Sequence, residues 1–172
     1  MSPRTPKKSP KYISSIDGLR ALAVFAVMLY HLGVNWIPGG FLGVDLFFVI
    51  SGYVITRLIL DSIQRSSALD LREFFLARLR RLYPALLFMM VGSTFIIALF
   101  APEAISRFLR DIPYVLTGTN NWHLVAEHRN YFEMIGRPPL LQHTWSLGVE
   151  FQFYLIWPLI LIFALKYFGK KN

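Results

Sequence analysis

The chain has 172 residues, of which 55% are hydrophobic, 16% aromatic and 16% charged, and it contains no cysteine. This composition favours a polytopic membrane protein over a soluble domain, and the missing thiol excludes a cysteine nucleophile, a cysteine-bound metal and a disulfide. The net charge of +8 sits between apolar runs, so we interpret it as membrane topology and expect no nucleic-acid partner.

Four apolar runs predict an all-α, polytopic transmembrane helix bundle with about four spans. Residues 1–15 are rich in proline and lysine and are predicted to form a disordered basic tail before an uncleaved first span over 16–34. Pro38-Gly39-Gly40 ends that run, and the second span is expected over 40–60. Further spans over 82–101 and 146–165 complete a partial membrane domain, 16–168, which a basic tail over 169–172 follows.

The distribution of lysine and arginine predicts the side of the membrane that each connecting segment occupies. Segments 1–20, 57–81 and 166–172 carry five, six and three of these residues, whereas the four in segment 102–145 are matched by four acids. Four spans place the first three segments on one side, which the positive-inside rule assigns to the cytoplasm. The remaining segment holds a short apolar piece, Ile112–Leu116, that suits a lid, a surface helix or a re-entrant segment.

Arg20 and His31 are the polar side chains that stand out in the first span. Their eleven-residue separation places them on one face of a helix, roughly 16 Å apart along its axis. Such a stripe should face protein or water rather than lipid. A snorkelling anchor would also explain Arg20, and a satisfied polar group would explain His31, but a neutral imidazole there can accept a proton from a hydroxyl group.

A cytoplasmic, amphipathic, arginine-rich helix is predicted over 71–84. Arg78 lies within its apolar stripe, and Arg81 lies beside the stripe one turn later. This placement indicates that both side chains are directed inward at an anion, to which guanidinium groups can offer bidentate hydrogen bonds. Binding of lipid headgroups is the alternative.

The fourth span is predicted to carry a polar face formed by Ser146, Glu150 and Tyr154, which His143 continues at the start of the helix. Hydrogen bonds that join the helices are the alternative for this face, and an aromatic belt is the alternative for Trp145 and Tyr154.

The second span adds a carboxylate and a small-residue pair to the candidate residues. Asp45, near the outer end of this span, could orient His31 as a carboxylate orients the imidazole of a catalytic triad, or it could be a solvated helix-end carboxylate. Ser51 and Gly52 lie further along the same span, where glycine also allows helices to approach closely.

Together these residues resemble the acyltransferase 3 family, integral membrane O-acyltransferases of bacterial cell-surface sugars. The matching motifs occur in the family's order, and they are Ile16–Ala23 with His31, Gly40–Gly52, Phe75–Pro84 and His143–Tyr154. The resemblance extends over most of the chain from residue 13 to residue 168.

The resemblance implies transfer of an acyl group, commonly acetyl, from cytoplasmic acyl-CoA to a hydroxyl group of a surface carbohydrate such as lipopolysaccharide, peptidoglycan or exopolysaccharide, or of a lipid-linked sugar. It assigns His31 and Glu150 to catalysis, and Arg20, Arg78 and Arg81 to the binding of acyl-CoA. The expected supporting residues are Asp17, Asp45, Ser51, Gly52, His143, Trp145, Ser146 and Tyr154. We expect no metal and no bound cofactor, with acyl-CoA as a co-substrate.

The resemblance also implies a multi-pass protein of the bacterial inner (plasma) membrane, in contact with the lipid bilayer. Family members carry more than four spans, so we expect this chain to be the amino-terminal part of such a protein, with the carboxy-terminal half of the membrane domain as its missing partner. Two alternatives stay open, namely a transporter or proton-conducting helix bundle, which intramembrane ionisable residues also suit, and an inactive truncated assembly subunit.

Overall fold

The computed structural model describes residues 13–34, 36–66, 69–127 and 139–168, and these residues form helices and turns with no strand. They divide into two compact units, one within Met1–Leu69 and one within Asp70–Asn172. The predicted all-α class is therefore confirmed. The predicted basic tails lie outside the described residues, apart from the start of the first helix.

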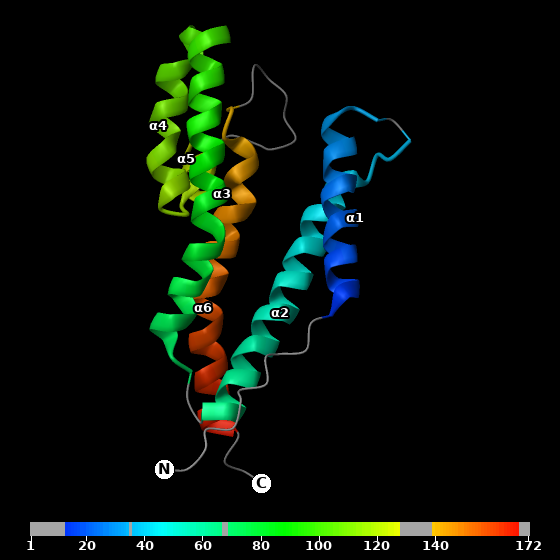
Figure 1. Ribbon diagram of the computed structural model, residues 1–172, viewed down its shortest axis with the longest axis vertical. Helices are drawn as coiled ribbons and strands as arrows, with labels where there is room; N and C mark the ends of the chain where they lie inside the picture. The colour runs from blue at the N-terminus through cyan, green and yellow to red at the C-terminus, as the bar shows by residue number, and fades with distance from the viewer. Residues whose placement is uncertain (1–12, 35, 67–68, 128–138, 169–172) are drawn as a thin grey trace, which may run out of the picture. The chain divides into compact units, whose positions relative to one another are not determined.

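The first unit is a helical hairpin, drawn in blue and cyan in Figure 1. Helix α1 (Ser14–His31) is joined through the short 3-10 helix η1 (Gly40–Leu42) to α2 (Gly43–Ser66), so the predicted break at Pro38–Gly40 is confirmed. Gly40 and Gly43 are buried where α2 begins. A Cβ atom at either position would lie far inside van der Waals contact with a backbone oxygen of α1, so the missing side chains permit this close packing.

The second unit begins with α3 (Leu71–Phe100), whose N-cap residue Asp70 accepts a hydrogen bond from the backbone nitrogen of Glu73 at 3.0 Å. The segment predicted as an arginine-rich helix over 71–84 is helical, and it continues without a break into the third predicted span as one 30-residue helix. Pro84 removes one backbone hydrogen bond but is exposed and flanked by good helix formers, so the helix continues past it.

The chain then folds back along α3. The 3-10 helix η2 (Pro102–Ala104) leads into α4 (Ile105–Leu116), whose last carbonyl group accepts a hydrogen bond from the hydroxyl group of Tyr83 at 2.6 Å. Since Tyr83 lies about 25 Å before the end of α3, α4 runs antiparallel to that helix. The buried apolar side chains between them are Leu86, Met90, Ile97, Phe108 and Val115, together with Leu141 from a later turn.

Two further helices complete the second unit. Helix α5 (Asn120–Ala126) follows α4, and the 3-10 helix η3 (Gln142–Thr144) precedes α6 (Trp145–Phe168), which runs back beside α3 in the opposite direction (Figure 1). The ring centroids of Tyr83 on α3 and Phe151 on α6 are 5.8 Å apart, which fixes the register of the two long helices.

Three helical segments in the described part of the chain are long and apolar enough to cross a membrane, namely Gly40–Arg65, Leu71–Phe100 and Gln142–Phe168. They contain the second and fourth predicted spans and all but the last residue of the third. Helix α1 is not among them, because its 18 residues include Asp17, Arg20 and the terminal His31. A membrane crossing by α1 therefore stays a prediction.

Candidate active site

The carboxylate and phenol predicted on one face of the last long helix are in direct contact. The hydroxyl group of Tyr154 donates a hydrogen bond to Oε1 of Glu150, one turn earlier on α6. Tyr154 is buried, with 7% of its surface exposed. Burial of a phenol requires a polar partner, and the Glu150 carboxylate supplies it.

Two arginines of α3 lie near the Glu150–Tyr154 pair. The positive charges of Arg78 and Arg81 act on the hydroxyl group of Tyr154. The antiparallel register explains this proximity, since the arginines lie before Tyr83 on α3 and Tyr154 lies after Phe151 on α6. We call Arg78, Arg81, Glu150 and Tyr154 the Arg–Glu–Tyr cluster.

The two arginines of the cluster differ in their surroundings. Arg78 is half-buried, and its guanidinium carbon lies 5.5 Å from the ring centroid of Phe74, within the range of a cation–π contact. Arg81 is exposed. The cluster can therefore hold an anionic group with guanidinium donors next to a carboxylate that accepts protons.

An amide network that the sequence did not predict supports this part of α6. The side-chain nitrogen of Gln152 donates to the carbonyl group of Gly118 at 3.1 Å and to Oδ1 of Asn121 at 2.9 Å. Its Oε1 accepts a hydrogen bond from the indole nitrogen of Trp122 at 3.2 Å. Gln152 thus fixes the turn that carries Glu150 against the start of α5. A polar side chain within an apolar helix was the signal in the sequence that could have identified Gln152. Its partners, however, are about 30 positions away and cannot be identified from the spacing of residues on one helix.

A second polar anchor lies at the start of the same helix. The side-chain nitrogen of Asn120 is buried and donates to the carbonyl group of Leu141 at 3.0 Å and to Oγ1 of Thr144 at 2.8 Å. Thr144 in turn donates to the carbonyl group of Leu141 at 2.7 Å. These bonds satisfy buried polar groups and hold η3, and hence the entry into α6, in one position.

The other residues predicted on this helix surround its first turn. His143 is exposed, Trp145 and Ser146 are half-buried, and the hydroxyl group of Ser146 donates to the carbonyl group of His143 at a long 3.4 Å. Their supporting roles stay predictions.

The first unit holds the remaining candidates, including the predicted base. Nδ1 of His31 lies 2.8 Å from the carbonyl oxygen of Val27. A carbonyl oxygen only accepts hydrogen bonds, so this contact places the hydrogen of a neutral ring on Nδ1 and leaves the lone pair on Nε2. His31 is exposed, and its ring makes an edge-to-face contact with Tyr30 at 5.6 Å. The side chain therefore presents a nitrogen that can accept a proton.

Arg20 is directed toward the second helix of the same hairpin. Its guanidinium carbon lies 5.9 Å from the ring centroid of Phe47 on α2. Asp17 and Asp45 are both exposed, and Ser51 is buried, with 9% of its surface exposed. The backbone carbonyl group of Gly52 accepts the Thr56 hydroxyl at 2.7 Å. The predicted pairing of Asp45 with His31 stays a prediction.

Helices long and apolar enough to span a membrane thus carry a polar site, in which a buried phenol is bonded to a carboxylate and lies near a half-buried and an exposed arginine. The chain matches the acyltransferase domain family over residues 13–172 and belongs to that family. It is a multi-pass membrane protein with three helices suited to spanning the bilayer.

Within this family, the chain is similar to several named O-acetyltransferases. It is 43% identical over 164 residues to the O-acetyltransferase OatA of Staphylococcus aureus and 44% identical over 164 residues to the peptidoglycan O-acetyltransferase OatA of Listeria monocytogenes. It is 42% identical over 152 residues to the putative peptidoglycan O-acetyltransferase YrhL of Bacillus subtilis. These alignments cover 95%, 95% and 88% of the chain but 27%, 26% and 24% of the relatives. The chain thus spans about a quarter of their length. No solved structure shows a significant match.

Proposed function

We propose that the chain is part of a membrane O-acyltransferase that moves an acetyl group from acetyl-CoA to a hydroxyl group of peptidoglycan. The observation that carries this proposal is the Arg–Glu–Tyr cluster, in which two guanidinium charges act on a buried phenol that is bonded to a carboxylate. The names of the relatives from Staphylococcus and Listeria support acetyl transfer, and those from Listeria and Bacillus support a peptidoglycan acceptor.

In this proposal the arginines bind the donor. Arg78 and Arg81 hydrogen-bond to phosphate oxygens of acetyl-CoA, for which the planar guanidinium group is well suited. Arg20 assists along the path of the acyl group. The positive-inside distribution supports a cytoplasmic location for the arginine-bearing end of α3, where acetyl-CoA is available, and for the amino terminus in the plasma membrane.

His31 is the proposed general base. The hydroxyl oxygen of the acceptor attacks the carbonyl carbon of the thioester while Nε2 of His31 takes the hydroxyl proton. The C–S bond breaks, the new C–O bond forms the ester, and the proton passes to the departing thiolate of CoA. The contact of Nδ1 with the Val27 carbonyl oxygen supports this role, because it requires a neutral ring to carry its hydrogen on Nδ1 and so makes Nε2 the basic nitrogen. Glu150, which already accepts the hydrogen of Tyr154, is the second proton-accepting group that we assign to the reaction.

Binding of acetyl-CoA to the purified protein in lipid nanodiscs tests the donor site. Arg78→Gln and Arg81→Gln should each weaken the affinity about tenfold or more, since each removes charge-assisted hydrogen bonds. Arg80→Gln is the matched control, because Arg80 is exposed on the same turn but is not part of the cluster. Equal acetyl-CoA affinity in all three variants would overturn the assignment.

A further inference from the structure

The loop that joins α1 to α2 carries the two most exposed large apolar side chains among the described residues of the first unit. Leu32 is 73% exposed and Trp36 is 82% exposed. Phe25 and Met28 are also exposed, on the stripe of α1 that Leu32 continues, so the apolar surface extends from the helix into the loop. An apolar surface of this kind indicates contact with a partner rather than with water.

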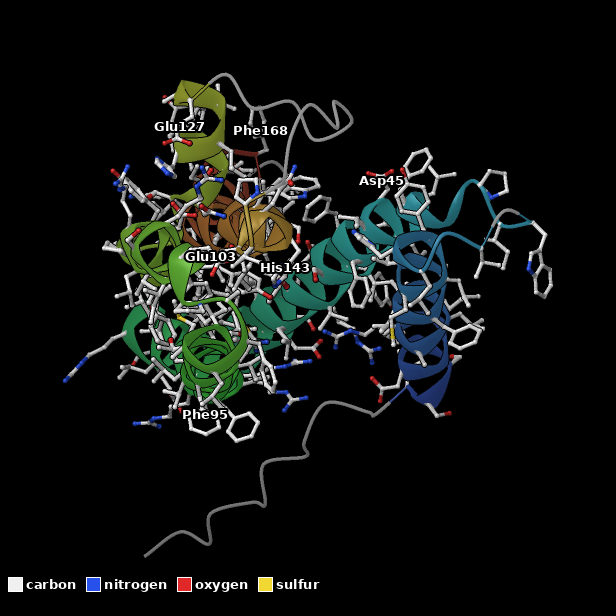
Figure 2. All side chains as sticks on the ribbon, turned by 90° about the horizontal axis from the view of Figure 1, so that it is seen from above. Asp45, Phe95, Glu103, Glu127, His143 and Phe168 are labelled. Atoms are coloured by element: carbon white, nitrogen blue, oxygen red, sulfur yellow. The ribbon has the colours of Figure 1, made fainter. Side chains whose placement is uncertain are left out.

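The sequence places no full charge on this surface. Between Arg20 and Asp45 there is no lysine, arginine, aspartate or glutamate. Figure 2 views the hairpin from its loop end and labels Asp45, which is exposed near the start of α2. Contact of the loop with lipid therefore requires no charged side chain of the loop to leave water.

The length of α2 gives the depth of the loop in a membrane. Arg57 and Asp61 form an ion pair at 4.0 Å, and both side chains are about one-third exposed, so this pair marks the far end of the apolar segment. About 20 helical residues cross a hydrocarbon core of about 30 Å, and counting that number back from Asp61 reaches Phe41, at the start of the helical segment Gly40–Arg65. Trp36 comes just before that point, at the level of the lipid headgroups.

Backbone hydrogen bonds hold the loop in a defined position at the end of α1. Gly33 has a φ of 71° and ends the helix in a Schellman motif, in which the amide of Val34 donates to the carbonyl group of Leu29 at 3.1 Å. The amide of Ile37 then donates to the carbonyl group of Val34 at 3.2 Å. A partner that holds this loop therefore also sets the position of His31, the last residue of α1.

We propose that Leu32 and Trp36 anchor the loop in the lipid interface, among the headgroups and the upper acyl chains. An indole ring combines a large apolar surface with one N–H donor, which suits a layer that is apolar on one side and wet on the other. The continuous apolar stripe from Phe25 to Leu32 leads to the same layer. This inference does not depend on the proposed acyl transfer. Its consequence for that proposal is that His31 acts close to the membrane surface.

Fluorescence quenching in liposomes tests the proposal, and the absence of cysteine from the chain allows a label at one chosen position. Trp36→Cys and Leu32→Cys each receive a nitrobenzoxadiazole label, and the full chain is reconstituted with lipids that carry a nitroxide either at the headgroup or deep in the acyl chain. The headgroup nitroxide should quench both labels about twofold or more strongly than the acyl-chain nitroxide. Val91→Cys, at a 71% exposed position in the apolar part of α3, is the matched control and should show the reverse order.

Three results would overturn the inference. Quenching of the loop labels by aqueous iodide, and by neither lipid, would show that the loop lies in water. Protection from iodide and from both lipids would show that protein covers it. Stronger quenching by the acyl-chain nitroxide would place the loop within the hydrocarbon core. Leu32 and Trp36 are both exposed, so neither substitution removes a packed side chain, and both labelled proteins should unfold at the temperature of the parent protein.

Discussion

The hydroxyl group of Tyr154 donates a hydrogen bond to the carboxylate of Glu150, one turn earlier on α6. The pair is placed within the influence of two arginine charges from α3. A carboxylate in this position has two effects, because it satisfies a buried phenol and it supplies a negative charge that can accept a proton. The two effects can be separated by substitution.

Glu150→Gln is expected to abolish most acyl transfer while the protein still folds. The amide oxygen of glutamine can accept the Tyr154 hydrogen bond, but it lacks the charge that makes the carboxylate a base. Loss of general-base catalysis typically lowers a rate by about 10²–10⁴-fold. The measurement is the O-acetyl content of cell-wall glycans in cells that produce the protein. Glu73→Gln, an exposed change on α3, should leave that content unaltered, and normal acetylation by the Glu150→Gln protein at equal abundance would contradict the assignment.

His31→Gln should lower the rate of transfer without changing the affinity for acetyl-CoA. His31 is exposed, so its replacement should leave no cavity in the packed interior. Glutamine cannot accept the proton that a neutral imidazole takes on Nε2, and a loss of about 10²–10⁴-fold is expected. Nanodisc titrations with acetyl-CoA, combined with assays of transfer, separate the two quantities. A parallel loss of affinity would show that His31 binds the donor rather than acting as a base.

Replacement of Gln152 is expected to change the stability of the protein rather than its chemistry. Gln152→Leu removes the partner of the Gly118 carbonyl group, the Asn121 side chain and the Trp122 indole. Leaving such groups unsatisfied should reduce the free energy of unfolding by about 1–3 kcal/mol. Thermal unfolding in detergent measures the change. Gln64→Leu, at an exposed position of α2, is the control. If the unfolding temperature changed by an equally small amount in both variants, the hydrogen bonds of Gln152 would contribute little to stability.

Periodicity and composition predicted the parts of the structure that depend on local sequence. The break at Pro38–Gly40 follows from the backbone preferences of proline and glycine, and the Glu150–Tyr154 contact follows from their four-residue spacing on a helix. The second and fourth long helices follow from continuous apolar runs that are bounded by polar residues.

The features that the sequence did not predict depend on packing between distant segments. The charges of Arg78 and Arg81 interrupt the hydropathy of α3 and so suggested a boundary, although the capped helix continues through them. The return of α4 along α3 depends on Phe108 and Val115, of which Val115 lies within the apolar piece Ile112–Leu116 and Phe108 lies one turn before it, and that piece is too short to suggest a packed helix. Gln152 and Asn121 are 31 positions apart, and only the tertiary fold brings their amides together.

The hairpin of α1 and α2 allows a matched comparison of two glycines. A Cβ atom at Gly43 would overlap with the Ala23 backbone oxygen and lie 2.8 Å from Cγ2 of Val27, whereas one at Gly18 would meet nothing within 4 Å. Gly43→Ala should therefore force the helices apart and destabilise the protein by about 1–3 kcal/mol.

Gly18→Ala should stabilise the same helix by up to about 1 kcal/mol, because alanine has the higher helix propensity. Unfolding temperatures of the two variants in the same detergent measure the contrast. Opposite shifts are expected because the two changes add the same methyl group, and only at Gly43 does that group meet the backbone of the neighbouring helix. If both variants were stabilised alike, α1 and α2 would not be packed at the distance that this hairpin requires.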